Sequence, residues 1–231
     1  MSQTIPMHII ARIRTDFPAK FGIPRQSGLA DTPARIVFEP EYRSADALRG
    51  IEGFSHLWLL WHFSETERAG WSPTVRPPKL GGNQRIGVFA TRSPFRPNAI
   101  GLSSVRLTRT ELHTSEGPVL HVLGADLMNN TPILDIKPYL AYTDAHPQAA
   151  GGFALQSQAG TLQVDCAPTL LAPLPADRRQ ALLAVLAQDP RPGYQHEPGR
   201  VYGFSFAGCE VRFTVEGDRL TVRSITSSGH T

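Results

Sequence analysis

The sequence predicts a mainly β protein, in which an N-terminal β-barrel domain with long basic loops precedes a small α+β C-terminal domain. Short segments rich in β-branched and aromatic residues fill the first 150 residues, and Gly, Pro or Asn bound them. Strands of this spacing, without helices between them, are typical of a barrel or sandwich rather than of βαβ units. Beyond residue 160, one amphipathic helix is followed by three more strands. The predicted domains are therefore residues 1–150 and 161–231.

The predicted strands of the barrel domain are short and spread along its whole length. They comprise residues 7–14, 34–39, 56–63, 86–90, 104–110 and 119–123. Residues 44–48 form the one helical turn expected in this half. The long loops 16–33, 67–85 and 91–101 are Pro-rich and carry most of the arginines. Long loops in a compact domain are usually functional or disordered, and we assign these to function.

The second domain begins after residues 149–160, a stretch of small residues typical of a flexible linker. Residues 175–188 predict a helix, with Pro near its start and Asp177 in its first turn. The two prolines in Asp189–Gly193 end this helix, because they lack donors and restrict their neighbours. Strands are expected at 201–205, 210–215 and 219–224.

Composition indicates a folded protein of the cell interior. The 231 residues are 41% hydrophobic and 19% charged, which excludes a disordered chain. Cys166 and Cys209 are too few for a disulfide scaffold and lack metal-ligand spacing, so we expect a reducing compartment. The longest apolar run, His56–Phe63, is far shorter than the roughly 20 residues of a membrane-spanning helix. Without a signal-peptide pattern either, we expect a cytoplasmic protein.

Charge is distributed unevenly along the chain, whose formal net charge is +3. Residues 1–109 carry 15 Lys and Arg against 8 Asp and Glu. No acidic residue lies between Glu67 and Glu111, a window that holds eight basic residues. A surface of one sign suits a large anion such as an RNA backbone. The alternative is that these side chains are spread around a sheet in solvent, and charge alone leaves both open.

Several signatures of enzymes are missing from the sequence. It contains no G-x-G-x-x-G after a strand, no Walker loop, no H-E-x-x-H, no C-x-x-C and no G-x-S-x-G. A Rossmann nucleotide site, ATP hydrolysis, metal-dependent hydrolysis and nucleophile-elbow chemistry are therefore disfavoured.

The densest polar loop is Thr91–Asn98, in which two prolines forbid a helix. The forked guanidinium groups of Arg92 and Arg96 suit phosphate or carboxylate, and the Asn98 amide can pair with an adenine edge. The alternative is a rigid loop that Phe95 packs, with its arginines in solvent.

A second loop, Lys20–Gln26, combines two cations, an amide and an aromatic ring. Phe21 would stack on an unpaired base while Lys20 and Arg25 hold the RNA backbone. The alternative is that Phe21 and Ile23 plug the barrel.

A third segment, Asp135–Tyr139, alternates polar and apolar residues as the end of a strand does. The alternation aims Asp135, Lys137 and Tyr139 to one face, where they can accept from and donate to a polar substrate. The alternative is an exposed ion pair between Asp135 and Lys137, which contributes little to stability.

Ser55 and His56 suggest a nucleophile and its base, but adjacent strand residues point to opposite faces. We therefore expect His56 to pack or to contact a ligand. Trp58 and Trp61 are expected in the core.

Six ordered segments carry a family resemblance over nearly the whole chain. They are Phe21–Gln26 with Leu29, Gly53–Trp58, Thr74–Asn83, Gly87–Ser103, Asp135–Tyr139 and Gln188–Tyr194. Together they resemble the bacterial YaeB/TrmO family. Its members are S-adenosylmethionine-dependent methyltransferases that act on N6 of threonylcarbamoyladenosine at position 37 of tRNA.

The resemblance implies a β-barrel catalytic domain, a small C-terminal domain and a homodimer. It also implies S-adenosylmethionine as the cofactor, no metal, no membrane association, and the tRNA anticodon loop as the partner. The reaction expected is methyl transfer to N6 of adenosine 37.

The resemblance also assigns roles to residues. The catalytic residues it implies are Asn98, Asp135 and Tyr139. The cofactor contacts it implies are Asp16, Phe17, Pro18, Ser55, His56, Arg92, Gly124, Ala125 and Asp126. With the basic loops, the expected tRNA contacts are Lys20, Arg25, Gln26, Arg76, Arg85, Arg96, Lys137 and Arg191.

The sequence departs from the family pattern at three places. Asn129-Asn130 replaces an expected Asp-Gly pair, and since Asn tolerates left-handed turns, the turn is expected to survive. A contact from a carboxylate there to the cofactor ribose would be lost. Ala99 and Ala141 replace prolines and are expected only to relax their loops.

Two other functions are compatible with the residues. A non-catalytic RNA-binding module would use the same basic loops, and binding of S-adenosylmethionine separates it from an enzyme. A methyltransferase for a small molecule or a protein would lack salt-dependent tRNA binding.

Overall fold

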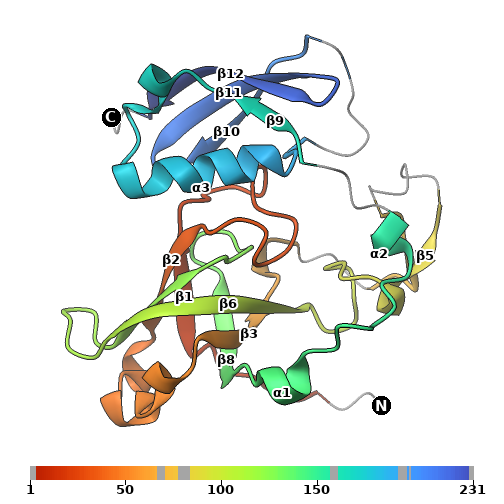
Figure 1. Ribbon diagram of the computed structural model, residues 1–231. Helices are drawn as coiled ribbons and strands as arrows, with labels where there is room; N and C mark the ends of the chain where they lie inside the picture. The colour runs from red at the N-terminus through yellow and green to blue at the C-terminus, as the bar shows by residue number, and fades with distance from the viewer. Residues whose placement is uncertain are drawn as a thin grey trace.

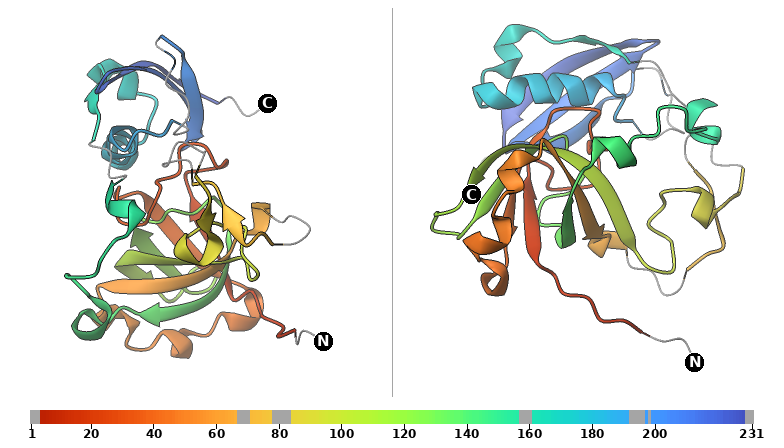
Figure 2. Two further views of the ribbon diagram at one scale, coloured as in Figure 1. Left: turned by 90° about the vertical axis from the view of Figure 1, so that its right-hand side faces the viewer. Right: turned by 60° about the horizontal axis from the view of Figure 1, so that its bottom comes forward.

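The computed structural model describes residues 4–66, 71–77, 84–156, 161–191, 197 and 199–228. It is a mainly β molecule, in which a closed barrel lies below a small unit of one sheet and one helix (Figure 1). This confirms the predicted fold class. The helix α3 (Ala176–Ala187) lies between the upper sheet and the barrel, as Figure 2 shows from two further sides.

Six strands close the barrel within the described residues, in the order β1-β2-β7-β6-β3-β8. Every neighbouring pair is antiparallel. The strands are β1 (Ala11–Thr15), β2 (Pro33–Phe38), β3 (His56–His62), β6 (Ile100–Glu111), β7 (Val119–Leu123) and β8 (Pro132–Pro138). Closure joins β1 to β8 and leaves no unpaired edge, so the barrel needs no covering element at its seam.

The predicted elements of this half need corrections, the first of which is the barrel strand β8, whose end alone was expected at Asp135–Tyr139. The strand expected at 86–90 is only β5 (Ile86–Gly87), which pairs with β4 (Thr74–Val75) in a small hairpin and leads into a 3-10 turn at Val88–Ala90. The helical turn expected at 44–48 is not the only short helical turn among the described residues of this half. Further short turns are Pro40–Tyr42, Ile51–Gly53, Ser64–Thr66 and α1 (Ala141–Asp144). Such turns leave no periodicity in the sequence because they span less than two helical repeats.

The barrel core follows from the alternation along the strands. In β3, Leu57, Leu59 and Trp61 point inward and are buried, while the residues between them face outward. Trp61 is in the core as predicted. The same expectation for Trp58 was wrong, because it lies on the outer face and donates from Nε1 to Asp144 Oδ2 at 2.8 Å.

The C-terminal unit is a four-stranded sheet in the described part of the chain, in the order β10-β11-β12-β9. The strands are β9 (Gln163–Asp165), β10 (Tyr202–Phe206), β11 (Cys209–Glu216) and β12 (Arg219–Ser227). The short parallel strand β9 was not predicted, since three residues show no alternation to detect. Leu182 and Leu186 of α3 are fully buried against the sheet residues Phe206, Phe213 and Leu220. Of the predicted linker, residues 153–156 form α2 (Phe153–Gln156), and 157–160 lie outside the described residues.

The loop between β1 and β2 belongs to both units. Phe17 and Ala30 are buried in the core cluster of the C-terminal unit, although they come from the barrel half of the chain. Asp16 accepts a hydrogen bond at its carbonyl oxygen from Ala207 N at 3.1 Å and pairs with Arg178 of α3. On the barrel side, Gly28 N donates to the Gly124 carbonyl oxygen at 2.9 Å. We propose 1–150 and 161–231 as domains that this loop joins.

In the described residues, no helix is both long and apolar enough to span a membrane.

Gly22 tests how tightly the shared loop packs on the C-terminal sheet. Its φ is +92°, and a Cβ there would lie 2.3 Å from Cδ2 of Phe204. Gly22→Ala is expected to lower the free energy of unfolding in urea by about 2–4 kcal/mol, combining left-handed strain with overpacking.

Gly28→Ala is the matched control for this substitution. Gly28 also has a positive φ, of +76°, but no atom lies within 4 Å of its Cβ position. It should cost only the backbone strain of about 1 kcal/mol. Equal losses in the two variants would contradict tight packing of the loop against Phe204.

Candidate functional site

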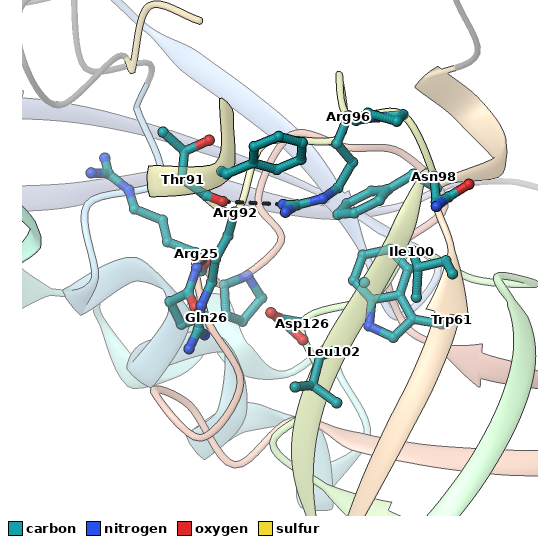
Figure 3. Close-up of a pocket in the computed structure, with 15 residues that line it drawn as sticks. Arg25, Gln26, Trp61, Thr91, Arg92, Arg96, Asn98, Ile100, Leu102 and Asp126 are labelled. Atoms are coloured by element: carbon teal, nitrogen blue, oxygen red, sulfur yellow. Dashed lines mark hydrogen bonds between the residues drawn. The ribbon is translucent and has the colours of Figure 1, made fainter. Parts of the chain in front are cut away.

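A cavity of about 650 Å³ opens at the end of the barrel where β3 ends and β6 begins (Figure 3). This volume lies within the range of about 300–1000 Å³ that is usual for small-molecule sites. The lining residues are Pro24, Arg25, Gln26, Trp61, Phe63, Phe89, Thr91, Arg92, Arg96, Pro97, Asn98, Ile100, Gly101, Leu102 and Asp126. Two of the three loops that the sequence singled out, 20–26 and 91–98, therefore meet at one cavity.

The 91–98 loop is braced by its own hydrogen bonds. Arg96 donates from Nη1 to the Thr91 carbonyl oxygen at 3.1 Å, and the Thr91 hydroxyl accepts from Ser93 N at 3.2 Å. The guanidinium group of Arg96 thus fixes the loop rather than extending into solvent. The braced loop brings Arg92 and Asn98 to the cavity (Figure 3).

The wall at residues 24–26 is fixed by the C-terminal unit. Arg25 donates from Nη2 to the carbonyl oxygens of Asp189 and Arg191, at 2.9 and 3.1 Å, just beyond the end of α3. The adjacent Gln26 accepts at Oε1 a hydrogen bond from Nη1 of Arg92. A continuous series of hydrogen-bonded residues therefore runs from the end of α3 to a cation of the cavity.

The turn that receives Arg25 is itself held by an ion pair. Asp189 has a φ of 50°, and its carboxylate accepts from Nε and Nη2 of Arg191 at 2.8 Å each. Burial raises the pKa of Asp189, but hydrogen bonds from Arg191 and its charge outweigh burial and leave that pKa below its ordinary value. The Arg191 side chain is only 10% exposed. Its expected contact with tRNA stays a prediction, and residues 192–194 of the same motif lie outside the described residues.

Asp126 supplies the carboxylate of the cavity. It accepts from the Ser103 hydroxyl at 2.5 Å, and that hydroxyl accepts from Nε1 of Trp61 at 3.0 Å. Burial raises the pKa of Asp126, while the Ser103 hydrogen bond and the nearby charge of Arg92 lower it, and the net shift is upward. The cavity thus contains a partly desolvated acid beside a cation, a setting common in functional sites.

A second cavity of about 240 Å³ shares the lining residues Trp61, Phe63 and Asp126 with the first. Lys20 lines it and donates from Nζ to the Glu65 carbonyl oxygen. Phe21, the candidate for stacking, instead packs edge-on against Phe204 of the C-terminal unit, with ring centroids 6.1 Å apart. Phe21 therefore neither stacks on a base nor plugs the barrel, because its ring packs in the contact between the two units.

The third singled-out segment lies away from the cavity. Asp135 and Lys137 are on the outer face of β8 and form an ion pair at 2.8 Å. Tyr139 follows the strand and packs against Trp58, with ring centroids 5.3 Å apart. Asp135 is paired through Leu60 with Leu102 of the cavity rim, two strand spacings or about 10 Å away.

Ser55 and His56 also lie outside the cavity. His56 begins β3 and lies five residues, or about 17 Å along the strand, from Trp61 near its other end. The expectation that they point apart was wrong, because Ser55 precedes the strand and its hydroxyl lies 3.0 Å from Nδ1 of His56.

The remaining predicted residues fall into three places. Gly124 and Ala125 are buried directly before Asp126 and fix its position through bonds to the shared loop, such as Thr32 Oγ1 to the Ala125 carbonyl oxygen at 3.0 Å. Asp16, Phe17 and Pro18 lie in the shared loop, where Phe17 is fully buried. Arg76 and Arg85 are exposed on and beside the β4–β5 hairpin. Among the described residues, no cluster of three or more His, Cys, Asp or Glu side chains can hold a metal ion.

Reasoning from the sequence missed the apolar half of the cavity. Trp61, Phe63, Ile100 and Leu102 line it but carry no polar signal. Gly101 was the available signal, because a Cβ there would lie 2.2 Å from Cε2 of Trp61. A glycine in a strand often marks such a close approach.

Fold and cavity together define a β-barrel protein with a cation-lined cavity at the barrel end. Residues 12–145 match the family model described as the tRNA-methyltransferase O N-terminal domain, and residues 160–228 match that of the TrmO C-terminal domain. The chain therefore belongs to the tRNA-methyltransferase O family.

Individual relatives are similar over most of their length. The tRNA (adenine(37)-N6)-methyltransferase of Escherichia coli is 42% identical over 215 residues, which are 89% of this chain and 91% of that protein. A putative S-adenosylmethionine-dependent methyltransferase of Pseudomonas aeruginosa, RcsF, is 42% identical over 217 residues, covering 88% and 90%. A crystal structure of TrmO from Pseudomonas aeruginosa superimposes with a TM-score of 0.76 at 32% identity, covering 97% of this chain and 100% of that one.

Asp126→Asn is expected to raise the unfolding temperature at neutral pH. Burial raises the folded-state pKa of Asp126, so the folded protein binds more protons than the unfolded chain between the two pKa values. Stability therefore falls as pH rises through that window, and Asn removes the charge responsible. Thermal unfolding followed as a function of pH should show an advantage for the variant that shrinks toward acidic pH.

Asp31→Asn provides the control, since this exposed aspartate pairs with Arg106 at 2.8 Å and should not gain stability when neutralised. If Asp126→Asn proved less stable than the wild type at neutral pH, the charge of Arg92 would outweigh the cost of burying the carboxylate.

Proposed function

We propose that this protein transfers a methyl group from S-adenosylmethionine to N6 of adenosine 37 in tRNA, in its threonylcarbamoyl form. The observation that carries the proposal is the cavity at the barrel end, where Arg92, Asn98 and Asp126 meet an apolar wall. Membership of the tRNA-methyltransferase O family supports it, as do the names of the relatives. The cytoplasm, where tRNA is modified, is the proposed location.

The cavity residues fit S-adenosylmethionine by their chemistry. This molecule supplies an electrophilic methyl group on a positively charged sulfur, and it carries an adenine, a ribose and an amino-acid end. Asp126 offers a partly desolvated carboxylate to a cation or a hydroxyl. Because burial raises the pKa of Asp126, such a partner would stabilise its charged form. Trp61 and Phe63 offer flat apolar surface, and Arg92 offers a guanidinium group to a carboxylate.

Asn98 is the proposed acceptor for the reacting amine. The exocyclic nitrogen of adenosine is a poor nucleophile because its lone pair is delocalised into the ring, so alignment contributes much of the rate. The Asn98 side-chain oxygen can accept a hydrogen bond from that nitrogen as its acidity rises during bond formation, and the proton that the nitrogen loses would pass to solvent. Its position on the loop that Arg96 braces would keep this oxygen fixed through the reaction.

Asp135 and Tyr139 are proposed to act from a second subunit of a homodimer. In a single chain, Asp135 lies on the outer face of β8, away from the cavity. Lys137 and Tyr139 accompany it on the same side, next to Trp58. Across a two-fold axis, this face of one subunit would stand opposite the cavity of the other.

The tRNA anticodon loop is the proposed RNA partner. The nucleotide at position 37 is unpaired, so the enzyme need not extract it from a duplex. The basic residues around the cavity, Arg25, Arg85, Arg92 and Arg96, are proposed to meet the RNA backbone directly or to shape the surface that does. Salt-sensitive binding is the expected consequence.

Mass spectrometry of tRNA incubated with the protein and S-adenosylmethionine tests the reaction. We expect one added methyl group on the nucleoside at position 37, and more of it when the threonylcarbamoyl group is present. Asn98→Ala should slow single turnover by about 100-fold with little change in tRNA affinity. Asn98→Asp keeps the accepting oxygen and should retain more of the rate.

A protein that binds tRNA but gives no calorimetric signal with S-adenosylmethionine would instead be a non-catalytic RNA-binding module. Single-turnover rates unchanged in Asn98→Ala would remove this residue from the reaction.

Mixing two inactive variants tests the shared site. Asn98→Ala removes a cavity residue, and Asp135→Ala removes one from the outer face of β8. After joint unfolding and refolding, mixed dimers should each hold one intact site, giving about a quarter of wild-type activity. A mixture as inactive as its components would contradict a site shared between subunits.

A further inference from the structure

Two exposed aromatic rings stand beside the cavity and take no part in either core. Trp71 is 52% exposed and Phe89 is 74% exposed. Their rings stack on each other, with centroids 6.3 Å apart and planes 25° from parallel. Phe89 also lines the cavity, so the pair begins at the site and extends outward from it. Contiguous exposed apolar surface of this kind often marks an interaction site.

The backbone around the pair is held firmly. The hairpin residues Thr74 and Val75 pair with Gly87 and Ile86, and Val88 N donates to the Pro73 carbonyl oxygen at 2.9 Å. Val88 is fully buried, which anchors the turn and leaves the adjacent Phe89 outside. The hairpin, labelled β5 in Figure 1, stands out beside the barrel. The two rings are therefore displayed by a fixed support.

The charge around Trp71 and Phe89 favours an anionic partner. The sequence has no acidic residue between Glu67 and Glu111, so none adjoins either ring in the chain. Arg85 is exposed and donates from Nη1 to Thr74 Oγ1 at 3.1 Å, at the base of the same hairpin. Aromatic faces flanked by cations are the common means of holding unpaired nucleotides, since the ring stacks on the base and the cation meets the phosphate.

We infer that Trp71 and Phe89 form a stacking platform for an unpaired base of the anticodon loop, next to the nucleotide whose base enters the cavity. This inference rests on the proposed function and adds to it how the RNA loop is held open beside the site. Phe89 connects the two events, because the same ring lines the cavity and carries the stacked pair.

Binding of an RNA hairpin with the sequence of an anticodon arm tests the platform. Trp71→Ala should weaken binding about tenfold or more, with unchanged calorimetric affinity for S-adenosylmethionine, because Trp71 does not line the cavity. Phe89→Leu, which keeps apolar area without a π face, should weaken RNA binding as well, whereas Phe89→Tyr should retain it. The exposed Tyr142 on α1 gives the matched control, and Tyr142→Ala should leave RNA affinity unchanged.

Two further readouts separate stacking from charge and from structure. The slope of log K against log salt should not change in Trp71→Ala, whereas Arg85→Ala should reduce its magnitude by about one. Removing the base of a nucleotide that flanks the target should weaken wild-type binding and produce no further loss in Trp71→Ala.

The outcomes are distinguishable. If the wild type neither binds nor methylates the RNA, the proposed function fails. If it does both and Trp71→Ala binds equally well, the platform is refuted. A variant that changes the sedimentation mass but not RNA affinity would assign the pair to contact with a second copy of the chain, which also overturns the inference.

Discussion

The structure depends on one segment, the loop of residues 16–30, being packed into two units at once. Its Phe17 and Ala30 complete the core of the C-terminal unit, and its Gly28 is bonded to the barrel. Between these anchors, Gly22 lies against Phe204 with no room for a side chain. Because the loop cannot shift at either end, the residues that follow Gly22 are delivered to the cavity in a fixed position.

This constraint gives the C-terminal unit a direct effect on the cavity. Arg25 reaches the carbonyl oxygens beyond α3, and the Asp189–Arg191 ion pair holds that turn in shape. Gln26 then accepts a hydrogen bond from Arg92 and so connects this turn to the cavity. The hydrogen bonds of Arg25 are partly buried, whereas the bond between Gln26 and Arg92 is exposed, so the Arg25 bonds contribute most of the stability of this arrangement. The small domain thus supports the cavity wall through Arg25, although the lining residues themselves come from the barrel half of the chain.

Local patterns in the sequence predicted most strands and the main helix, but they did not predict the contacts between distant segments. The apolar and aromatic residues of His56–Phe63 and the turn residues around them predicted a strand. The number and spacing of such strands predicted a barrel or a sandwich, and the family resemblance implied the barrel. The prolines of Thr91–Asn98 correctly predicted that this loop forms no helix. The place of Trp61 in the cavity wall was missed, because it depends on Gly101, a strand partner 40 residues away. Phe21 was misjudged for the same reason, since the ring it meets belongs to the other unit.

The strand geometry also bears on whether one chain or two chains form the reacting site. Asp135 and Lys137 project from the outer face of β8, and a β-strand cannot turn two side chains to its other face without shifting its register by one residue. Such a shift would expose Ile133 and Ile136, which pack in the barrel core. The strands therefore hold Asp135 about 10 Å from Leu102, the cavity residue that shares this outer face through Leu60. If Asp135 and the cavity residues act on one substrate, that substrate must span the barrel rim, or a second subunit must complete the site.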